Sequence, residues 1–432
     1  MPTVLLIGDG DLAEETRQAL DAEGADVYRM KAPEEREVKH ALAGGDIDRV
    51  VVVSRKDAVV LRTALMVRNC DPEVPMLVTI FDPTMAGQVD RDLEHCVVTS
   101  MADIVAPSLA GPCLGDDLVA VREEGDPPVG IRETGDGGVE DTPIEVPDQR
   151  RAAALAAAVF APYDKSAALL LWGALGLVVI LLLETVACMA VLGQGVVDAA
   201  YGSAKTLVTV DPNDEVADGP KGLKVFLTVS MLTALVFEAS FTAGLVNRLV
   251  NKRLTGLVGR RAVPRRDHVV VVGMGQVGLK LCLLLRACGI GIVAVDDREE
   301  GENVGFAREF GFPVVIGRGA DPSLLRRLSL KRACALAAVT DDDLENISIA
   351  MAARSVNPDL RVVLRAGDGR VANETRSLFR IGLVRDVHRI AAVLIAARAT
   401  GSEATRVVCI EHEAHLLFED GRLEEAAVSA AN

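Results

Sequence analysis

Two long apolar runs in the middle of the chain limit what it can fold into. The first, at 167–183, contains 17 consecutive uncharged residues and ends at Glu184. The second, at 225–246, contains 22 residues and is interrupted only by Glu238. Helices of this length cross the hydrocarbon core of a bilayer, because an α-helix rises about 1.5 Å per residue. We therefore predict that both runs span a membrane; buried helices of a soluble protein are the alternative.

Basic residues flank the two predicted spans, which we place at 166–192 and 222–248. They are Arg150, Arg151 and Lys165 before the first span, and Arg248, Lys252, Arg253, Arg260, Arg261, Arg265 and Arg266 after the second. Because basic flanks stay in the cytoplasm, we predict a multi-pass protein of the cell membrane with both termini cytoplasmic. The segment 193–221 is then predicted to lie outside.

Composition argues against two other classes of protein. The formal charge of −16 and the pI near 5.0 argue against a general nucleic-acid binder, which needs a basic face, so a nucleic acid is not an expected partner. The eight cysteines form no CxxC pair and have no histidines at metal-ligand spacing. We therefore predict reduced structural thiols and no metal site.

A repeat surrounds the two spans. Residues 3–20 resemble 268–285, each reading as a strand, a glycine-rich turn and a helix, and 48–82 parallel 334–368 in the same way. Alternating strands and helices predict parallel, doubly wound sheets. The predicted fold is therefore a Rossmann-like α/β domain on each side of an α-helical membrane module.

The second copy has the features of a nucleotide site. Gly273, Gly275 and Gly278 form a GxGxxG directly after the strand "HVVVV", and the next predicted strand ends at Asp296 and Asp297. Glycines allow backbone N–H groups to approach a pyrophosphate, and a carboxylate accepts hydrogen bonds from ribose hydroxyls. We expect NAD(H) or ATP/ADP, because the paired acids repel a 2′-phosphate. A purely structural turn is the alternative.

The first copy is degraded. It keeps Gly8 and Gly10, but Ala13 replaces the third glycine, and the following strand has no carboxylate at its end. It is also shorter by a segment that matches a strand and a helix of the second copy. We expect it to assemble rather than to bind nucleotide.

These boundaries divide the whole chain. The predicted parts are a degenerate domain at 1–120, a mostly irregular linker with a pre-membrane helix at 121–165, the first span, the outer loop, the second span, a basic linker at 249–266, a nucleotide-binding domain at 267–400 and a tail at 401–432. Within the first linker, "VGIRE" can add an edge strand, and the tail can begin a hairpin.

This order of parts resembles the RCK (regulator of potassium conductance) domains of prokaryotic potassium channels, joined to a two-helix pore module. That family carries TxxTVGYGD as its selectivity filter after a short pore helix. The corresponding stretch here is "TLVTVDPND", made of Thr206, Leu207, Val208, Thr209, Val210, Asp211, Pro212, Asn213 and Asp214. Both threonines, the valine and the final Asp match, and the preceding residues can form the short helix. An ordinary Asp-Pro turn is the alternative.

The resemblance implies an altered filter. Glycines in a filter adopt left-handed conformations, whereas Pro212 fixes its φ and removes an N–H. Rings of Asp211 and Asp214 carboxylates would favour cations with weak discrimination, monovalent or divalent. Glu238, near mid-bilayer on the helix after the loop, is expected to face water or ions.

The resemblance also implies an assembly. RCK domains of this family form rings of eight beneath a tetrameric pore, and a homotetramer of this chain supplies that number. Nucleotide binding would then gate the pore. Arg318, in "GRGA", replaces an acidic residue of the family and is a candidate phosphate contact. No catalytic constellation follows the nucleotide fold, so an enzyme is not expected; the alternative function is a nonconducting membrane nucleotide sensor or channel-associated regulator.

Overall fold

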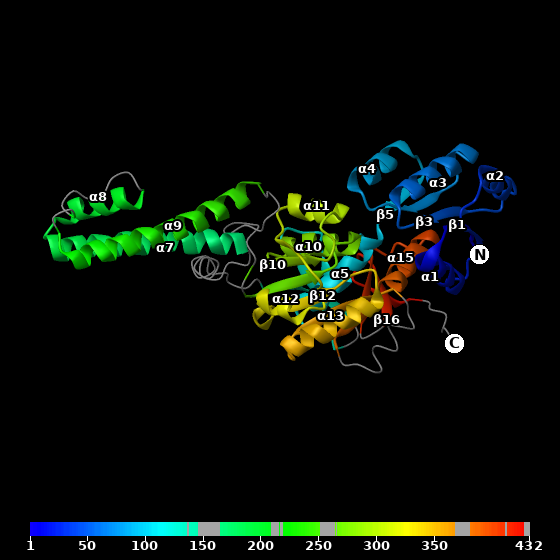
Figure 1. Cartoon of the computed structure of the whole chain (residues 1–432). Helices are drawn as coiled ribbons and strands as arrows, with labels where there is room; N and C mark the ends of the chain where they lie inside the picture. Colours follow the sequence, from blue (N-terminus) through cyan, green and yellow to red (C-terminus); the bar gives the residue numbers. More distant parts are fainter. Residues whose placement is uncertain are drawn as a thin grey trace. The chain divides into compact units, whose positions relative to one another are not determined.

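The computed structural model describes most of the chain and divides it into two units. The described residues are 1–135, 138–145, 165–208, 216, 219–250, 264, 266–367, 381–410 and 413–426, without the side chains of 165–168 and 247–250. One unit comprises Met1–Gln149 with Pro264–Asn432, and the other is Arg150–Val263. Figure 1 shows the elements of each unit in colours that follow the sequence.

The second copy forms a parallel sheet of six strands. Their order is β11-β10-β9-β12-β13-β14, and they pair in parallel throughout. The central strands are runs of buried valine and alanine, which is typical of a sheet covered by helices on both faces. The strands are β9 (His268–Val272), β10 (Gly291–Asp296), β11 (Val314–Ile316), β12 (Ala335–Ala338), β13 (Arg361–Ala366) and β14 (Leu383–Asp386). Its helices are α10 (Gln276–Ala287), α11 (Glu302–Glu309), α12 (Pro322–Arg327) and α13 (Asp343–Val356).

The first copy forms a similar sheet with one strand fewer. Its order is β2-β1-β3-β4-β5, and among the described residues nothing pairs with β2 where β11 pairs with β10. Its strands are β1 (Thr3–Gly8), β2 (Asp26–Met30), β3 (Arg49–Val53), β4 (Met76–Thr79) and β5 (Cys96–Thr99). Its helices are α1 (Gly10–Ala22), α2 (Glu35–Ala43), α3 (Asp57–Cys70) and α4 (Pro83–Asp92). The predicted fold class of two Rossmann-like domains is confirmed.

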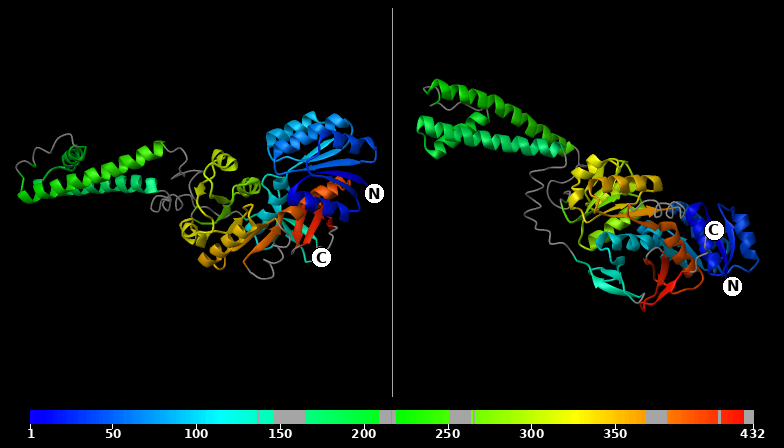
Figure 2. Two further views of the ribbon diagram at one scale, coloured as in Figure 1. Left: turned by 45° about the vertical axis from the view of Figure 1, so that its right-hand side comes forward. Right: turned by 90° about the horizontal axis from the view of Figure 1, so that it is seen from below.

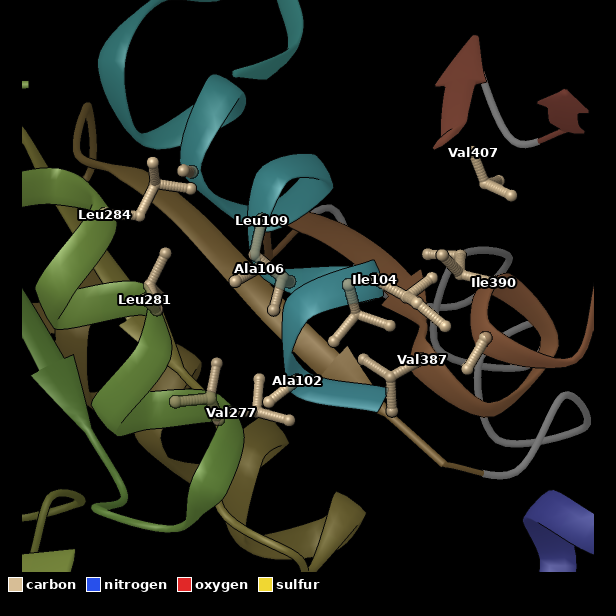
Figure 3. Packing of buried hydrophobic residues seen from close by; sticks show 14 of the residues in the cluster. Ala102, Ile104, Ala106, Leu109, Val277, Leu281, Leu284, Val387, Ile390 and Val407 are labelled. Carbon is tan, nitrogen blue, oxygen red and sulfur yellow. The ribbon is translucent and has the colours of Figure 1, made fainter. Parts of the chain in front are cut away.

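Each copy sends its next helix onto the other copy. Helix α5 (Met101–Leu114) follows β5 but packs against α10 and the sheet of the second copy. Helix α15 (Val387–Ala399) follows β14 and packs against α1 of the first copy. Both are apolar on almost every side, as helices enclosed by protein are. Figure 3 shows α5 between Leu281 of α10 and Ile390 of α15.

A small antiparallel sheet follows each exchanged helix. These sheets are β6 (Leu118–Arg122), β7 (Val129–Glu133) and β8 (Val139–Pro143), and β15 (Arg406–Ile410), β16 (Glu413–Leu417) and β17 (Leu423–Glu425). They meet through Val119, Ile131, Val408 and Leu417, and Figure 2 shows them side by side. The structure therefore differs from the mostly irregular linker and tail of the sequence analysis. Each segment has too few apolar residues to predict a sheet alone, but the two cover each other.

The second unit consists of helices. Helix α7 (Lys165–Leu192) and helix α9 (Lys221–Val250) each contain a stretch long and apolar enough to cross a membrane, with a mean hydropathy of 2.6 and 1.7. The two helices pack closely because Gly176 has no side chain: a Cβ there would lie 2.4 Å from the ring of Phe237. The shorter helix α8 (Val196–Leu207) lies against both (Figure 1).

The exchanged helix predicts an unusually sensitive core position. Leu109 of α5 is fully buried between the copies, so Leu109→Ala should lower the free energy of unfolding of the purified full chain by about 2–5 kcal/mol. Val97→Ala, a half-exposed position on β5, is the control and should change it by less than about 0.5 kcal/mol. Urea denaturation followed by circular dichroism measures both values. Equal effects of the two substitutions would contradict the enclosed position of α5.

Candidate nucleotide site

The glycine-rich turn between β9 and α10 needs its glycines for different reasons. Gly273 has a φ of +100°, and a Cβ there would lie 2.7 Å from the backbone nitrogen of Thr340. A Cβ on Gly278 would lie 1.9 Å from the carbonyl oxygen of Gly273, so this glycine lets the helix approach the turn. Gly275, at the N-cap of α10, faces open space. That space, at a helix N-terminus, fits a phosphate.

Asp296 ends β10 beside this turn. Its side chain is 5% exposed, and its carboxylate accepts hydrogen bonds from the backbone N–H groups of Met274, at 2.7 Å, and Arg298, at 2.9 Å. The carboxylate thereby fixes the glycine turn. Each carboxylate oxygen has more than one lone pair, so the group can still accept from a ribose hydroxyl. Asp297 is more exposed and lies at the edge of the site.

A cleft of about 440 Å³ opens between these groups. It lies where the sheet order changes direction, between β9 and β12, which is where doubly wound sheets bind ligands. Its lining comes from the turn, the ends of β10, β12 and β13, and the first copy: Arg55, Met101, Val272, Gly273, Met274, Gly275, Gln276, Val277, Asp296, Asp297, Arg298, Asn303, Gly317, Gly319, Val339, Thr340, Asp341, Glu345 and Arg365.

The structure brings together most, but not all, of the predicted nucleotide residues. Gly273, Gly275, Asp296 and Asp297 line the cleft, whereas Gly278 supports the turn from behind. Arg318 is exposed and is not part of the lining, although the glycines on both sides of it are. In the described conformation, Arg318 is therefore not one of the residues that line the cleft.

Two arginines that the sequence analysis did not identify line the same cleft. Arg365 is buried at the end of β13 and donates to the carbonyl of Thr340 at 3.1 Å. Arg55 follows β3 of the first copy, and its Nη2 lies 2.9 Å from Nε2 of His388. Motif spacing gives no signal for either residue, because only the packing of the two copies places Arg55 here. The cleft is therefore a composite of both copies.

His388 connects Arg55 to the exchanged helix α15. Its side chain is fully buried, and its Nδ1 lies 2.7 Å from the carbonyl oxygen of Gly367. Burial, together with the charge of Arg55, lowers the pKa of His388 to about 4. The imidazole is therefore neutral at physiological pH, with Nδ1–H donating to Gly367 and Nε2 accepting from Arg55.

Nearby acids offset the positive charge of buried Arg365 only partly. Burial and the repulsion of Arg55 lower the pKa of Arg365 to about 10, against the attraction of Asp343 and Asp341. It remains protonated at neutral pH. Its Nε atom has no hydrogen-bond partner among the described residues.

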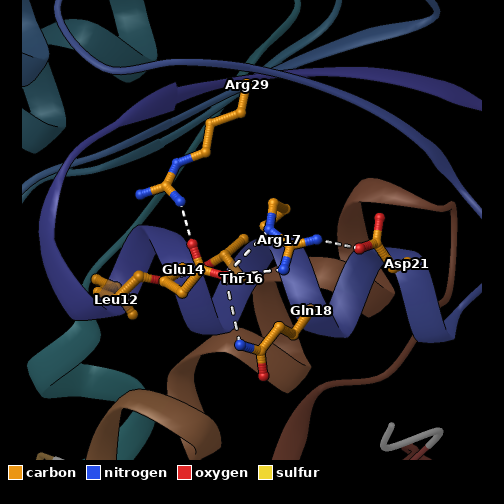
Figure 4. A network of polar contacts seen from close by, with 7 residues as sticks. All are labelled: Leu12, Glu14, Thr16, Arg17, Gln18, Asp21 and Arg29. Atoms are coloured by element: carbon orange, nitrogen blue, oxygen red, sulfur yellow. Dashed lines mark hydrogen bonds and ion pairs between the residues drawn. The ribbon is translucent and has the colours of Figure 1, made fainter.

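The corresponding turn of the first copy is built differently. A Cβ on Gly8 would lie 2.4 Å from the carbonyl oxygen of Val53, so the turn is packed closely against β3. The first turns of α1 carry Asp11 and Glu14 in place of an anion-binding surface. Glu14 forms ion pairs with Arg17 and Arg29, and the hydrogen bond from Arg17 lowers its pKa to about 2 (Figure 4). Negative charge at this helix N-terminus disfavours a phosphate.

In the helical unit, the structure describes only part of the predicted filter segment. Thr206 is buried near the end of α8 and donates to the carbonyl of Gly202 at 3.0 Å. Thr209, Val210, Asp211, Pro212, Asn213 and Asp214 lie outside the described residues. Their predicted role as a filter therefore stays a prediction.

The two carboxylates of the spans lie in different surroundings. Glu184 is 1% exposed and accepts a hydrogen bond at 2.6 Å from Ser230 of α9, which ties the two long helices together. Glu238 is exposed, one turn beyond the buried Ala234 on α9. The expectation that Glu238 faces water or ions stays a prediction.

Comparisons with known proteins agree with this architecture. Residues 269–381 match the family described as the TrkA-N domain. The voltage-gated potassium channel Kch of Escherichia coli is 23% identical over 188 residues, 42% of this chain and 45% of the relative. Potassium channel protein 1 of Methanocaldococcus jannaschii is 23% identical over 207 residues, 44% of this chain and 60% of the relative. The chain thus spans about half the length of the curated relatives it matches.

A solved channel has a similar fold over most of this chain. The GsuK channel is 12% identical, with a TM-score of 0.50 that covers 92% of this chain and 64% of that one. The same channel bound to NAD gives a TM-score of 0.48 at 14% identity, with the same coverage. The second copy thus matches the TrkA-N domain over 269–381, and the chain is similar to potassium channel proteins. The resemblance to RCK-domain channels is confirmed.

The different surroundings of the glycines predict different effects of the same substitution. Gly275→Ala adds a methyl group that meets no protein atom within 4 Å but projects into the cleft. It should lower nucleotide affinity at least about tenfold and leave the melting temperature unchanged. Gly278→Ala is the matched control: it should lower the melting temperature, because its Cβ meets a backbone oxygen at 1.9 Å. Calorimetric titration measures the nucleotide affinity of both variants, and thermal unfolding measures their melting temperatures. Equal losses of melting temperature would contradict the different surroundings of Gly275 and Gly278.

The buried imidazole predicts how stability depends on pH. Since the pKa of His388 is about 4 in the folded chain against an ordinary value of 6.5, the unfolded chain binds the proton first as the pH falls. This contribution to stability is complete above pH 6.5 and is lost progressively toward pH 4. Between pH 7 and pH 5 it amounts to about 2 kcal/mol.

His388→Gln should therefore reduce the loss of unfolding free energy between pH 7 and pH 5 by about that amount, in urea denaturation at both pH values. His40→Gln, at an exposed position on α2, is the control and should leave the full loss. A variant at His388 with the pH dependence of the unchanged chain would show that this imidazole titrates normally.

Proposed function

We propose that this chain is a subunit of a homotetrameric, nucleotide-gated cation channel, with a cytoplasmic ring of eight RCK domains and an altered filter. The observation that carries the proposal is the composite cleft, which has the glycine turn and Asp296 of one copy and Arg55 and Met101 of the other. A ligand in such a cleft touches both copies. It can therefore favour one arrangement of the ring, to the extent that its affinity differs between arrangements.

Exposed apolar side chains on equivalent helices of the two copies support assembly into a ring. Helix α3 follows β3, helix α13 follows β12, and both strands neighbour the first strand of their sheets. Each of these helices exposes large apolar side chains, Val59 and Leu65 on α3, and Leu344 and Met351 on α13. Exposed apolar residues at the same place in both copies indicate a contact with further copies. Four chains would supply the eight domains.

The helical unit supports a pore with weak discrimination among cations. Helix α8 has the length and place of a pore helix, and Thr206 in its last turn begins the filter-like stretch. Asp211 and Asp214 would place carboxylates at the mouth in each subunit, where they attract monovalent or divalent cations. Both termini would be cytoplasmic, since the basic residues flank the spans on that side.

The ligand proposed for the ring is an adenine nucleotide, NAD(H) or ATP/ADP. The open space at Gly275, the helix N-terminus behind it and the Asp296 carboxylate match the pyrophosphate and ribose of such a molecule. The role is regulatory rather than catalytic, because no side chains suited to hydride transfer are part of the described lining beyond the nucleotide groups.

A nonconducting sensor is the second candidate. It is favoured by Pro212, which cannot adopt the backbone of a filter glycine. Such a protein would bind nucleotide through the same cleft and signal to a partner. A measurement of ion conduction distinguishes this sensor from a channel.

Flux through purified protein in liposomes tests the channel. K⁺, Na⁺ or Ca²⁺ should enter, and ATP or NAD should change the rate. Asp211→Asn should lower the flux several-fold, because it removes a ring of charge from the mouth. Asp198→Asn removes the same charge from exposed helix α8 and should leave the flux within about twofold. No flux with any nucleotide would favour the sensor.

A further inference from the structure

One end of the cleft carries positive charge that the proposed function does not yet use. Arg365 of the second copy and Arg55 of the first both line it. Among the described residues neither arginine forms an ion pair: Arg365 donates to a backbone carbonyl, and Arg55 to His388. Because that imidazole is neutral, it supplies no negative charge to offset that of Arg55.

Burial makes this arrangement costly without an anion. Arg365 is 7% exposed, and its buried Nε has no hydrogen-bond partner in the described part of the chain. Two guanidinium groups near each other also repel, as the effect of Arg55 on Arg365 shows. Asp343 and Asp341 offset part of this charge, and Asp341 also lines the cleft. An anion that accepts from both arginines would relieve the remaining repulsion.

The sheet order places the two arginines beyond the pyrophosphate. Asp296 ends β10 on one side of the glycine turn, whereas Arg365 lies at the end of β13 on the other side. A nucleotide with its ribose at Asp296 and its phosphates on the turn therefore extends toward Arg365 and Arg55. The group that reaches them is a terminal phosphate in a mononucleotide or a second nucleoside in a dinucleotide.

The chemistry of the two arginines favours the terminal phosphate. A guanidinium donates two parallel hydrogen bonds to phosphate oxygens. A nicotinamide riboside offers no anionic group, and its oxidised ring carries a positive charge. Glu345 also lines the cleft; burial and the charges of Asp297, Asp342 and Asp296 raise its pKa, against a hydrogen bond with Thr340.

We infer, on the basis of the nucleotide-binding role proposed above, that Arg55 and Arg365 form a subsite for the terminal phosphate of a nucleoside di- or triphosphate. The cleft thereby distinguishes ADP and ATP from AMP and NAD. Because the first copy supplies Arg55, the subsite is incomplete in the second copy alone. Binding also draws Arg55 from His388, which lies in the first turn of helix α15 beside the carbonyl of Gly367.

Calorimetric titration of the purified full chain with AMP, ADP, ATP and NAD tests this inference. The unchanged chain should bind ADP and ATP at least about tenfold more tightly than AMP and NAD. Arg55→Ala should weaken ADP and ATP about tenfold and leave AMP within about twofold. Arg36→Ala, an exposed position on α2 of the same copy, removes the same charge and should change none of the four.

The outcomes separate the subsite from the proposed function. If all four molecules bind equally, or if Arg55→Ala weakens AMP as much as ATP, the terminal-phosphate subsite is wrong while the nucleotide-binding role remains. If none of the four binds, the nucleotide-binding role itself is wrong. If Arg55→Ala lowers the melting temperature more than Arg36→Ala does, the same titrations are repeated with Arg55→Lys. This substitution keeps the charge but removes the planar pair of donors. A loss confined to ADP and ATP supports the subsite; an equal loss for AMP contradicts it.

Discussion

The burial of two exchanged helices is the interaction on which the rest of the α/β unit depends. Helices α5 and α15 are apolar on nearly all sides, so neither can remain stable on the surface of its own sheet. Each becomes enclosed only when the two copies pair. The pairing therefore couples the stability of the copies, although a membrane module of more than a hundred residues separates them in the sequence.

The same pairing creates the ligand cleft. The glycine turn and Asp296 belong entirely to the second copy, and they form a local site of the kind found at the ends of parallel strands. Arg55 and Met101 reach this site only because α5 crosses to the second sheet. A ligand that contacts both copies can bind one arrangement of the pair more tightly than another. A ring that gates a pore would require this difference in affinity.

Sequence reasoning was accurate where the determinants are local and failed where two distant segments complete each other. The glycine spacing after "HVVVV" predicted the turn, since backbone clearance at Gly273 and Gly278 is a property of adjacent residues. The small sheets were largely missed, because Ile131 and Leu417 become buried only against each other's segments. Arg318 was chosen because it replaces an acidic residue of the RCK family; it is not part of the cleft lining, and its contact with a phosphate stays a prediction.

The sequence by itself determined the two Rossmann-like copies, their parallel strands, the glycine turn and the two apolar spans. These follow from periodicity, glycine positions and run length, which act over a few tens of residues. The tertiary structure alone decided that Arg55 and Arg365 share one cleft, that His388 is neutral, and that α5 is enclosed by the other copy. Such features depend on burial and on charges that lie close in space but far apart in the chain, and no local pattern specifies them.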